Sequence, residues 1–186
     1  CGDDRFARLY QSKDGTHFDT LVDRLFTEGY PNESSIVFDG QKAICLLRRD
    51  GNPNTAQIGT ALPPYTHWDW KDLGVRIGGP HMLLLPDGRL IAAVRLLTPK
   101  PRTSLCWIDP DQGTLTEALQ LPSGGDTSYA GLVLDDKTLW VSYYSSHESK
   151  TSIYLSKVEV PTQAIDIASQ RELFVDHFLI DRLNNT

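Results

Sequence analysis

Carboxylate, arginine and tyrosine side chains recur at matching places in three successive stretches of the sequence. Arginine donates paired N–H bonds to carboxylates, and aromatic rings pack on the faces of sugars. The set therefore predicts one surface that binds an anionic or hydroxylated ligand. Its members are Glu33, Arg48 and Arg49 in the first stretch, His81 and Arg95 in the second, and Asp126, Ser128, Tyr129, Tyr143 and Tyr144 in the third.

A purely structural interpretation of the same residues stays open. In it the arginines are solvated strand ends and Tyr143 packs between neighbouring sheets. Other kinds of chemistry are disfavoured: the five histidines show no HxxxH or HExxH spacing, so we expect no metal, and we expect no cofactor because no GxGxxG, P-loop or GxSxG motif occurs. Four tryptophans fall in predicted strands, where core packing is the favoured role: Trp68, Trp70, Trp107 and Trp140.

The elements that must position these residues follow a repeat. Asp39, Asp87 and Asp135 each follow a short apolar run and begin a turn, and they lie 48 residues apart. A blade of a β-propeller takes about 40–50 residues and holds four strands. The period therefore predicts an all-β fold, a partial β-propeller of four-stranded antiparallel blades, with about three blades and a remnant of another.

Each unit contains short runs of β-branched and aromatic residues separated by Gly, Pro, Asn and Asp, which is typical of strands joined by hairpins. Residues 19–26 and 163–169 are alternative short helices. The predicted strands are 6–12 and 18–25 in the preceding unit, 34–38, 42–48, 56–61 and 67–75 in the first full unit, 81–85, 89–97, 103–108 and 114–121 in the second, and 129–134, 138–144 and 152–160 in the third, whose fourth strand is not evident.

Blade geometry predicts where the site lies. The first strand of a blade lines the central axis, so residues that begin first strands and end second strands gather on the face opposite the Asp turns. A closed propeller needs at least four blades, and we therefore expect the remaining blades elsewhere in the same polypeptide. We assign residues 1–165 to the incomplete propeller and 166–186 to a following module or a closing strand, with 171–180 as its clearest apolar run.

Composition excludes some partners. The 186-residue chain carries a net charge of −6 with a pI near 5.3, so a nucleic-acid backbone is an unfavourable partner. No run of 18 apolar residues occurs, which argues against a membrane span. Cys45 and Cys106 lie in apolar strand patterns, as buried thiols do. Cys1 fits either a lipidated mature N-terminus or, as we favour, a point inside a longer chain.

Several motifs resemble the sialidase-like six-bladed propeller superfamily with its recurring Asp-box hairpins. Residues 12–18, Ser-Lys-Asp-Gly-Thr-His-Phe, look like a shortened S-x-D-x-G-x-x-W box, and 63–68 fall where a degenerate second box belongs. Gly78–His81 leading into Leu85–Arg89, and Gly125–Tyr129 leading into Trp140–Tyr144, strengthen the match. The resemblance covers residues 5–160 and implies a secreted, periplasmic or cell-surface bacterial protein.

The resemblance also implies roles. A sialidase-type retaining hydrolase uses a Tyr nucleophile. The phenol can react because a neighbouring carboxylate accepts its proton. By this likeness Glu33 is the base, Tyr129 or Tyr143 the nucleophile and Asp126 the acid. Arg48 and Arg95 hold a substrate carboxylate, aided by the other residues of the surface: His81, Ser128 and Tyr144. The alternative is a non-catalytic carbohydrate- or protein-binding propeller module.

Overall fold

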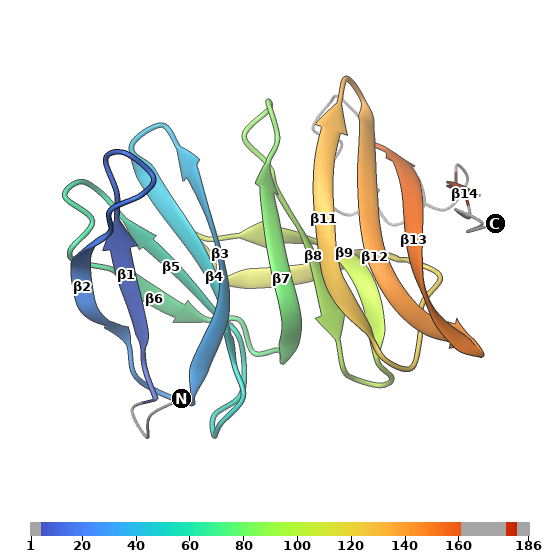
Figure 1. Ribbon diagram of the computed structural model, residues 1–186, viewed down its shortest axis with the longest axis horizontal. Helices are drawn as coiled ribbons and strands as arrows, with labels where there is room; N and C mark the ends of the chain where they lie inside the picture. The colour runs from blue at the N-terminus through green and yellow to red at the C-terminus, as the bar shows by residue number, and fades with distance from the viewer. Residues whose placement is uncertain (1–4, 161–177, 182–186) are drawn as a thin grey trace.

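The computed structural model describes residues 5–160 and 178–181, and every regular element in these ranges is a β-strand (Figure 1). Strands β1 (Ala7–Gln11) and β2 (Asp19–Phe26) pair antiparallel as a two-stranded sheet, so the alternative helix over 19–26 is wrong. The alternative helix over 163–169 and the predicted domain boundary at 165 lie outside the described residues. None of the described elements is a helix that could span a membrane.

Three four-stranded sheets follow, and each is a simple antiparallel meander. The predicted strands are confirmed, and the missing fourth strand of the third unit is β14, which pairs with β13. The sheets are β3 (Pro31–Asp39), β4 (Lys42–Arg49), β5 (Gln57–Ala61) and β6 (Asp69–Asp72); then β7 (Ile77–Leu84), β8 (Leu90–Leu96), β9 (Arg102–Asp109) and β10 (Thr114–Gln120); then β11 (Thr127–Asp135), β12 (Thr138–Glu148), β13 (Lys150–Glu159) and β14 (Phe178–Asp181).

The first strands of the three sheets are neighbours in space. Strand β7 contacts β3 on one side and β11 on the other, while the later strands of each sheet extend away from this line. Figure 1 shows the arrowheads of β3, β7 and β11 all pointing the same way. Three consecutive sheets with adjacent, like-directed first strands are the arrangement of propeller blades, as the repeat predicts.

The turns between first and second strands lie at the same end of the three sheets (Figure 1). In the first and third sheets the pairs Asp39↔Lys42 and Asp135↔Thr138 close two-residue loops. Gly40 and Asp136 lead these loops with left-handed φ angles of 56° and 52°, a conformation that glycine and aspartate tolerate better than most residues. The middle turn is longer, because the last pair is Leu84↔Leu90.

The core lies between the sheets, and β8 is its centre because both of its faces are buried. Ala92 and Val94 pack with the apolar cluster toward the first sheet, whereas Ile91 and Ala93 pack with the cluster toward the third. This explains the uninterrupted apolar sequence of β8, as expected for a strand covered on both faces. The predicted burial of Cys45 is confirmed, and desolvation raises the pKa of its thiol to about 12. Cys106 is buried as well.

The blade-to-blade core is tested by Leu46→Ala. Leu46 is fully buried between the first two sheets, whereas Leu62, just after β5, is 65% exposed. Truncating a buried leucine costs about 2–5 kcal/mol, and the exposed control Leu62→Ala should stay within about 0.5 kcal/mol of wild type. Urea unfolding followed by tryptophan fluorescence measures both, and equal losses would contradict this packing.

Candidate functional site

The end of the sheets opposite those turns is shaped by three β-bulges. The ladder between first and second strands breaks between Pro31 and Ser34 in the first sheet, between Gly78 and His81 in the second, and between Ser128 and Gly131 in the third. A bulge bends a strand and re-aims its side chains. Because the three bulges share one place in the repeat, they turn three backbone segments toward the same region.

Strand register identifies the equivalent residues. The pairs Ser35↔Leu46, His81↔Ala93 and Gly131↔Ser142 each lie at or next to the last regular pair before the bulge. Two residues before these pairs on the first strands lie Glu33, Gly79 and Tyr129, at the bulges. Two residues after the same pairs on the second strands lie Arg48, Arg95 and Tyr144, beside the bulges. The repeat therefore places all six residues at this end of the sheets.

Glu33 accepts hydrogen bonds from the first strands of the other two sheets, β7 and β11, and from β4 in its own sheet. The phenolic O–H of Tyr129 donates to Oε1 at 2.6 Å, across 96 residues of chain. The backbone N–H of Gly79 donates to Oε2 at 2.9 Å, and Arg48 Nη1 donates to the same oxygen at 2.7 Å. One carboxylate therefore joins all three first strands.

These contacts set the ionisation of the pair. Partial burial opposes the charge on Glu33, but the bonds from Tyr129, Arg48 and Gly79 outweigh it and hold the pKa of the carboxyl below its usual range. The carboxylate acceptor in turn raises the pKa of Tyr129 above that of an ordinary phenol. In the resting protein the shared proton therefore belongs to Tyr129.

All three nitrogens of Arg48 donate to carboxylates. Besides the bond to Glu33, its Nε and Nη2 donate to Asp50 at 3.1 and 3.0 Å. Asp50 also accepts from Asn32 Nδ2 at 2.7 Å, and Arg76 lies 3.5 Å from it. The sequence did not predict a role at the site for three of these residues: Asn32, Asp50 and Arg76. The Arg-Arg-Asp run at the end of β4 is the signal that could have indicated Asp50.

A second carboxylate lies beside the first. Asp126 accepts a hydrogen bond from Tyr144 O–H at 2.8 Å and lies 3.6 Å from Arg95 Nη1. The rings of Tyr144 and Tyr129 are 6.2 Å apart between centroids, so the two acid–phenol pairs are neighbours. The site therefore consists of two carboxylates, each hydrogen-bonded to a tyrosine and near an arginine.

Two buried polar atoms at this site have no hydrogen-bond acceptor or donor among the described residues: Arg95 Nε and Ser128 Oγ. Both lie against the Gly78-Gly79 dipeptide. A Cβ on Gly78 would lie 2.7 Å from Arg95 Nε, and one on Gly79 would overlap Ser128 Oγ. The glycines therefore leave the room that the arginine and serine occupy.

Three residues of the predicted surface lie elsewhere. Tyr143 is buried in the core, where its ring stacks on Tyr154 and its O–H donates to Pro122 O, so the expectation that it joins the site is wrong. Side chains alternate across a strand, and Tyr144 takes the site-facing position. Arg49 is buried beside Thr55 and Asp72 in the first sheet. His81 bonds Ala130 O and links β7 to β11.

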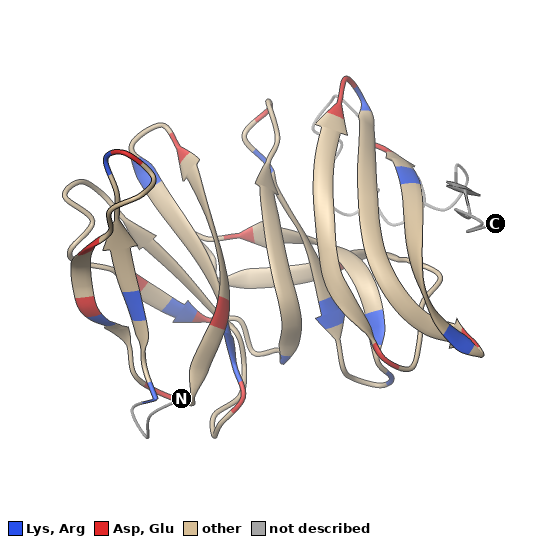
Figure 2. Ribbon diagram, viewed as in Figure 1, with Lys and Arg blue, Asp and Glu red and all other residues tan. Residues whose placement is uncertain are grey.

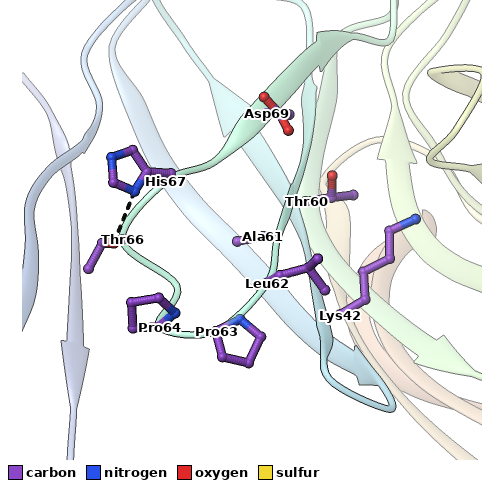
Figure 3. A pocket seen from close by; sticks show the side chains of 9 residues that line it. All are labelled: Lys42, Thr60, Ala61, Leu62, Pro63, Pro64, Thr66, His67 and Asp69. Atoms are coloured by element: carbon purple, nitrogen blue, oxygen red, sulfur yellow. Dashed lines mark hydrogen bonds between the residues drawn. The ribbon is translucent and has the colours of Figure 1, made fainter.

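The opposite end of the sheets has different features. Asp14 accepts from the backbone N–H groups of Thr16 and His17, each at 2.8 Å, and so closes the turn between β1 and β2. A hollow of about 430 Å³ lies beside the β5–β6 loop, with Lys42 and His67 on its two sides (Figure 3). Figure 2 shows that acidic and basic segments occur at both ends of the sheets.

Solved structures share this fold. A protein of unknown function from Dyadobacter fermentans matches with a TM-score of 0.73 and 22% identity, over 83% of this chain and 45% of that one. The Xyloglucan PUL GH43B protein of Bacteroides ovatus gives 0.64 and 14%, over 96% and 36%. An endo-1,4-beta-xylanase from Bacteroides thetaiotaomicron gives 0.60 and 10%, over 96% and 64%.

At these identities the likeness shows the fold: the chain has the all-β, propeller-like architecture found in proteins described as glycoside hydrolases. The chain spans less than two thirds of the length of each of the three. No family model and no curated protein matches it. In the described part of the chain, no group of three or more His, Cys, Asp or Glu side chains is placed to hold a metal ion.

The close approach at Gly79 is tested by Gly79→Ala with Gly40→Ala as its control. Both glycines are left-handed, with φ of 52° and 56°, but a Cβ at Gly40 meets nothing within 4 Å, whereas one at Gly79 meets Ser128 Oγ and lies 2.8 Å from Tyr129 N. Gly40→Ala should cost about 1–2 kcal/mol of unfolding free energy from φ alone. Gly79→Ala should cost about 1–3 kcal/mol more from overpacking. Equal losses in urea unfolding would show that β7 and β11 are not in close contact there.

Proposed function

We propose that this end of the sheets is the active site of a glycoside hydrolase that acts on an anionic or otherwise decorated glycan by a sialidase-type retaining mechanism. The observation that carries the proposal is the 2.6 Å hydrogen bond from Tyr129 O–H to Glu33 Oε1, beside a second carboxylate at Asp126. A phenol becomes a nucleophile when a base accepts its proton during attack, and Glu33 is in position to do so.

The proposed reaction has two steps. In the first, Tyr129 Oη bonds to the anomeric carbon while its proton passes to Glu33, and protonated Asp126 gives its proton to the departing glycosidic oxygen. In the second, Asp126 takes a proton from water, whose oxygen replaces Tyr129 at the same carbon, and Glu33 returns its proton to the phenol. Two displacements give net retention of configuration.

The features around the pair support this chemistry. Tyr129 is 62% exposed, so its hydroxyl is open to a substrate. Its backbone holds a left-handed φ of 51° at the bulge; such strain in a non-glycine residue is most common at functional sites. The Arg95 side chain is 20% exposed and its Nη1 lies 3.6 Å from Asp126, so its Nη groups can donate to a carboxylate or hydroxyl of a sugar bound beside that residue.

A non-catalytic glycan-binding module is the second candidate, and two observations favour it. The bonds that depress the pKa of Glu33 also make it a weaker base. Arg48 is moreover shared between Glu33 and Asp50 and so has less capacity for a substrate. Binding through Arg95, Tyr129 and Tyr144 would need neither proton transfer nor a free Arg48.

The two candidates are separated by assaying the natural polypeptide that carries these residues. A panel of sialosides and uronic-acid glycosides is tested with wild type, Tyr129→Phe and Glu33→Gln. We expect kcat to fall by at least about a thousandfold in both variants, because removing the nucleophile or its base removes the chemical step. Tyr143→Phe is the matched control, since its hydroxyl bonds Pro122 O in the core, and its kcat should stay near wild type.

Turnover that is unchanged in Tyr129→Phe and Glu33→Gln would contradict the catalytic assignment. Glycan binding without turnover in wild type, weakened by Arg95→Ala, would establish the binding module instead. Circular dichroism and thermal melting of each variant show whether a loss of activity comes from a loss of fold.

A further inference from the structure

A cavity of about 470 Å³ lies beside the proposed active site and takes no part in the chemistry above. Its walls come from the loop that follows β8, with Pro99, Lys100 and Pro101, and from the segment that leads into β11, with Ser123 to Gly125. The first segment follows the strand that carries Arg95, and Gly125 is bonded directly to Asp126. The cavity wall therefore ends at the residue before Asp126, the group proposed to protonate the leaving oxygen.

The floor of the cavity is a closed ion pair. Arg102 donates to both carboxylate oxygens of Glu117, from Nε at 2.7 Å and from Nη2 at 2.6 Å. Its Nη1 donates to Thr98 O at 2.7 Å, and Ser104 Oγ donates to Glu117 Oε1 at 2.6 Å. A bidentate pair of this kind is neutral as a whole and has little remaining capacity for a ligand.

Lys100 therefore decides the charge of the cavity. The lysine side chain is exposed, and no partner for it occurs among the described residues. With Arg102 and Glu117 neutralising each other, the cavity carries one net positive charge. Around Glu33 and Asp126, in contrast, Arg48, Arg76 and Arg95 each lie within 4 Å of a carboxylate. Lys100 has no carboxylate within 4 Å among the described residues, and it lines the cavity.

We propose that this cavity is a subsite for a uronic acid unit of an oligosaccharide, whose carboxylate pairs with Lys100 while the neighbouring unit lies at Tyr129 and Asp126. The volume falls in the range of small-molecule sites and exceeds what one sugar ring needs. Pro99 and Pro101 supply apolar surface for the ring, and the amide of Gln120 supplies a donor and an acceptor for hydroxyls. The proposal rests on the proposed function and specifies the substrate as an acidic oligosaccharide.

The expected effect of Lys100 is modest and salt-dependent. An exposed lysine–carboxylate pair strengthens binding by about twofold to fivefold, and 0.5 M salt screens most of it. A monosaccharide that occupies the active site alone does not reach the subsite. The charge preference therefore depends on chain length, on Lys100 and on ionic strength together.

The test compares charged uronates with their neutral methyl esters, measured by calorimetry on the natural polypeptide. Tetramers of galacturonate and of mannuronate are titrated beside their methyl esters, at 0.05 and 0.5 M salt, with the monosaccharides as short ligands. Lys100→Gln removes the charge. Lys137→Gln is the matched control, because Lys137 is an exposed lysine in the β11–β12 turn at the opposite end of the sheets.

We expect at least one acidic tetramer to bind more tightly than its ester by about twofold to fivefold beyond any preference that the monosaccharide shows through Arg95. This additional preference should be lost in Lys100→Gln and at high salt, and kept in Lys137→Gln. This result without any turnover would uphold the subsite while contradicting the hydrolase. No additional preference in wild type, no binding of any tetramer, or an additional preference that survives Lys100→Gln would overturn the subsite.

Discussion

The hydrogen bonds that the Glu33 carboxylate accepts are the interactions on which the arrangement of this end of the molecule depends. It lies on β3 and accepts hydrogen bonds from Gly79 on β7 and Tyr129 on β11, so one side chain joins the first strands of three consecutive sheets. Two of its three donors, Arg48 and Gly79, bond the same oxygen. A half-buried acid that accepts several bonds stays ionised, and its negative charge is what fixes the proton on Tyr129.

The backbone makes this convergence possible. Strands β3, β7 and β11 belong to three separate sheets. The three bulges lie where Glu33, the Gly79 amide and Tyr129 meet across these sheets. Gly78 and Gly79 then admit Arg95 and Ser128 where any larger residue would overlap them. The adjacent cavity with Lys100 is joined to this site through the chain, because its wall residues Ser123 to Gly125 come directly before Asp126.

The fold was largely predictable from the sequence, because a 48-residue spacing of aspartate turns between alternating apolar runs has few structural solutions. The meeting of Glu33, Arg48, Tyr129, Asp126 and Arg95 followed from blade geometry in the same way. Tyr143 was misplaced because Tyr143-Tyr144 is an ambiguous pair: one ring must enter the core and the other must face the site, and a shift of one residue decides which. The Gly79 amide was missed because a backbone donor leaves no signature in residue type.

The most direct test of this account is the phenolic pKa of Tyr129, measured by an NMR titration of the protein with ¹³C-labelled tyrosine and assigned with Tyr129→Phe. We expect a Tyr129 pKa above the ordinary value of about 10, because the hydrogen bond to ionised Glu33 holds the phenolic proton. In Glu33→Gln the pKa of Tyr129 should fall back toward that value, while the pKa of Tyr144, raised by burial and by its bond to Asp126, should stay raised. A Tyr129 pKa that is ordinary in wild type and unmoved by Glu33→Gln would contradict the contact from which both the site and its proposed chemistry are built.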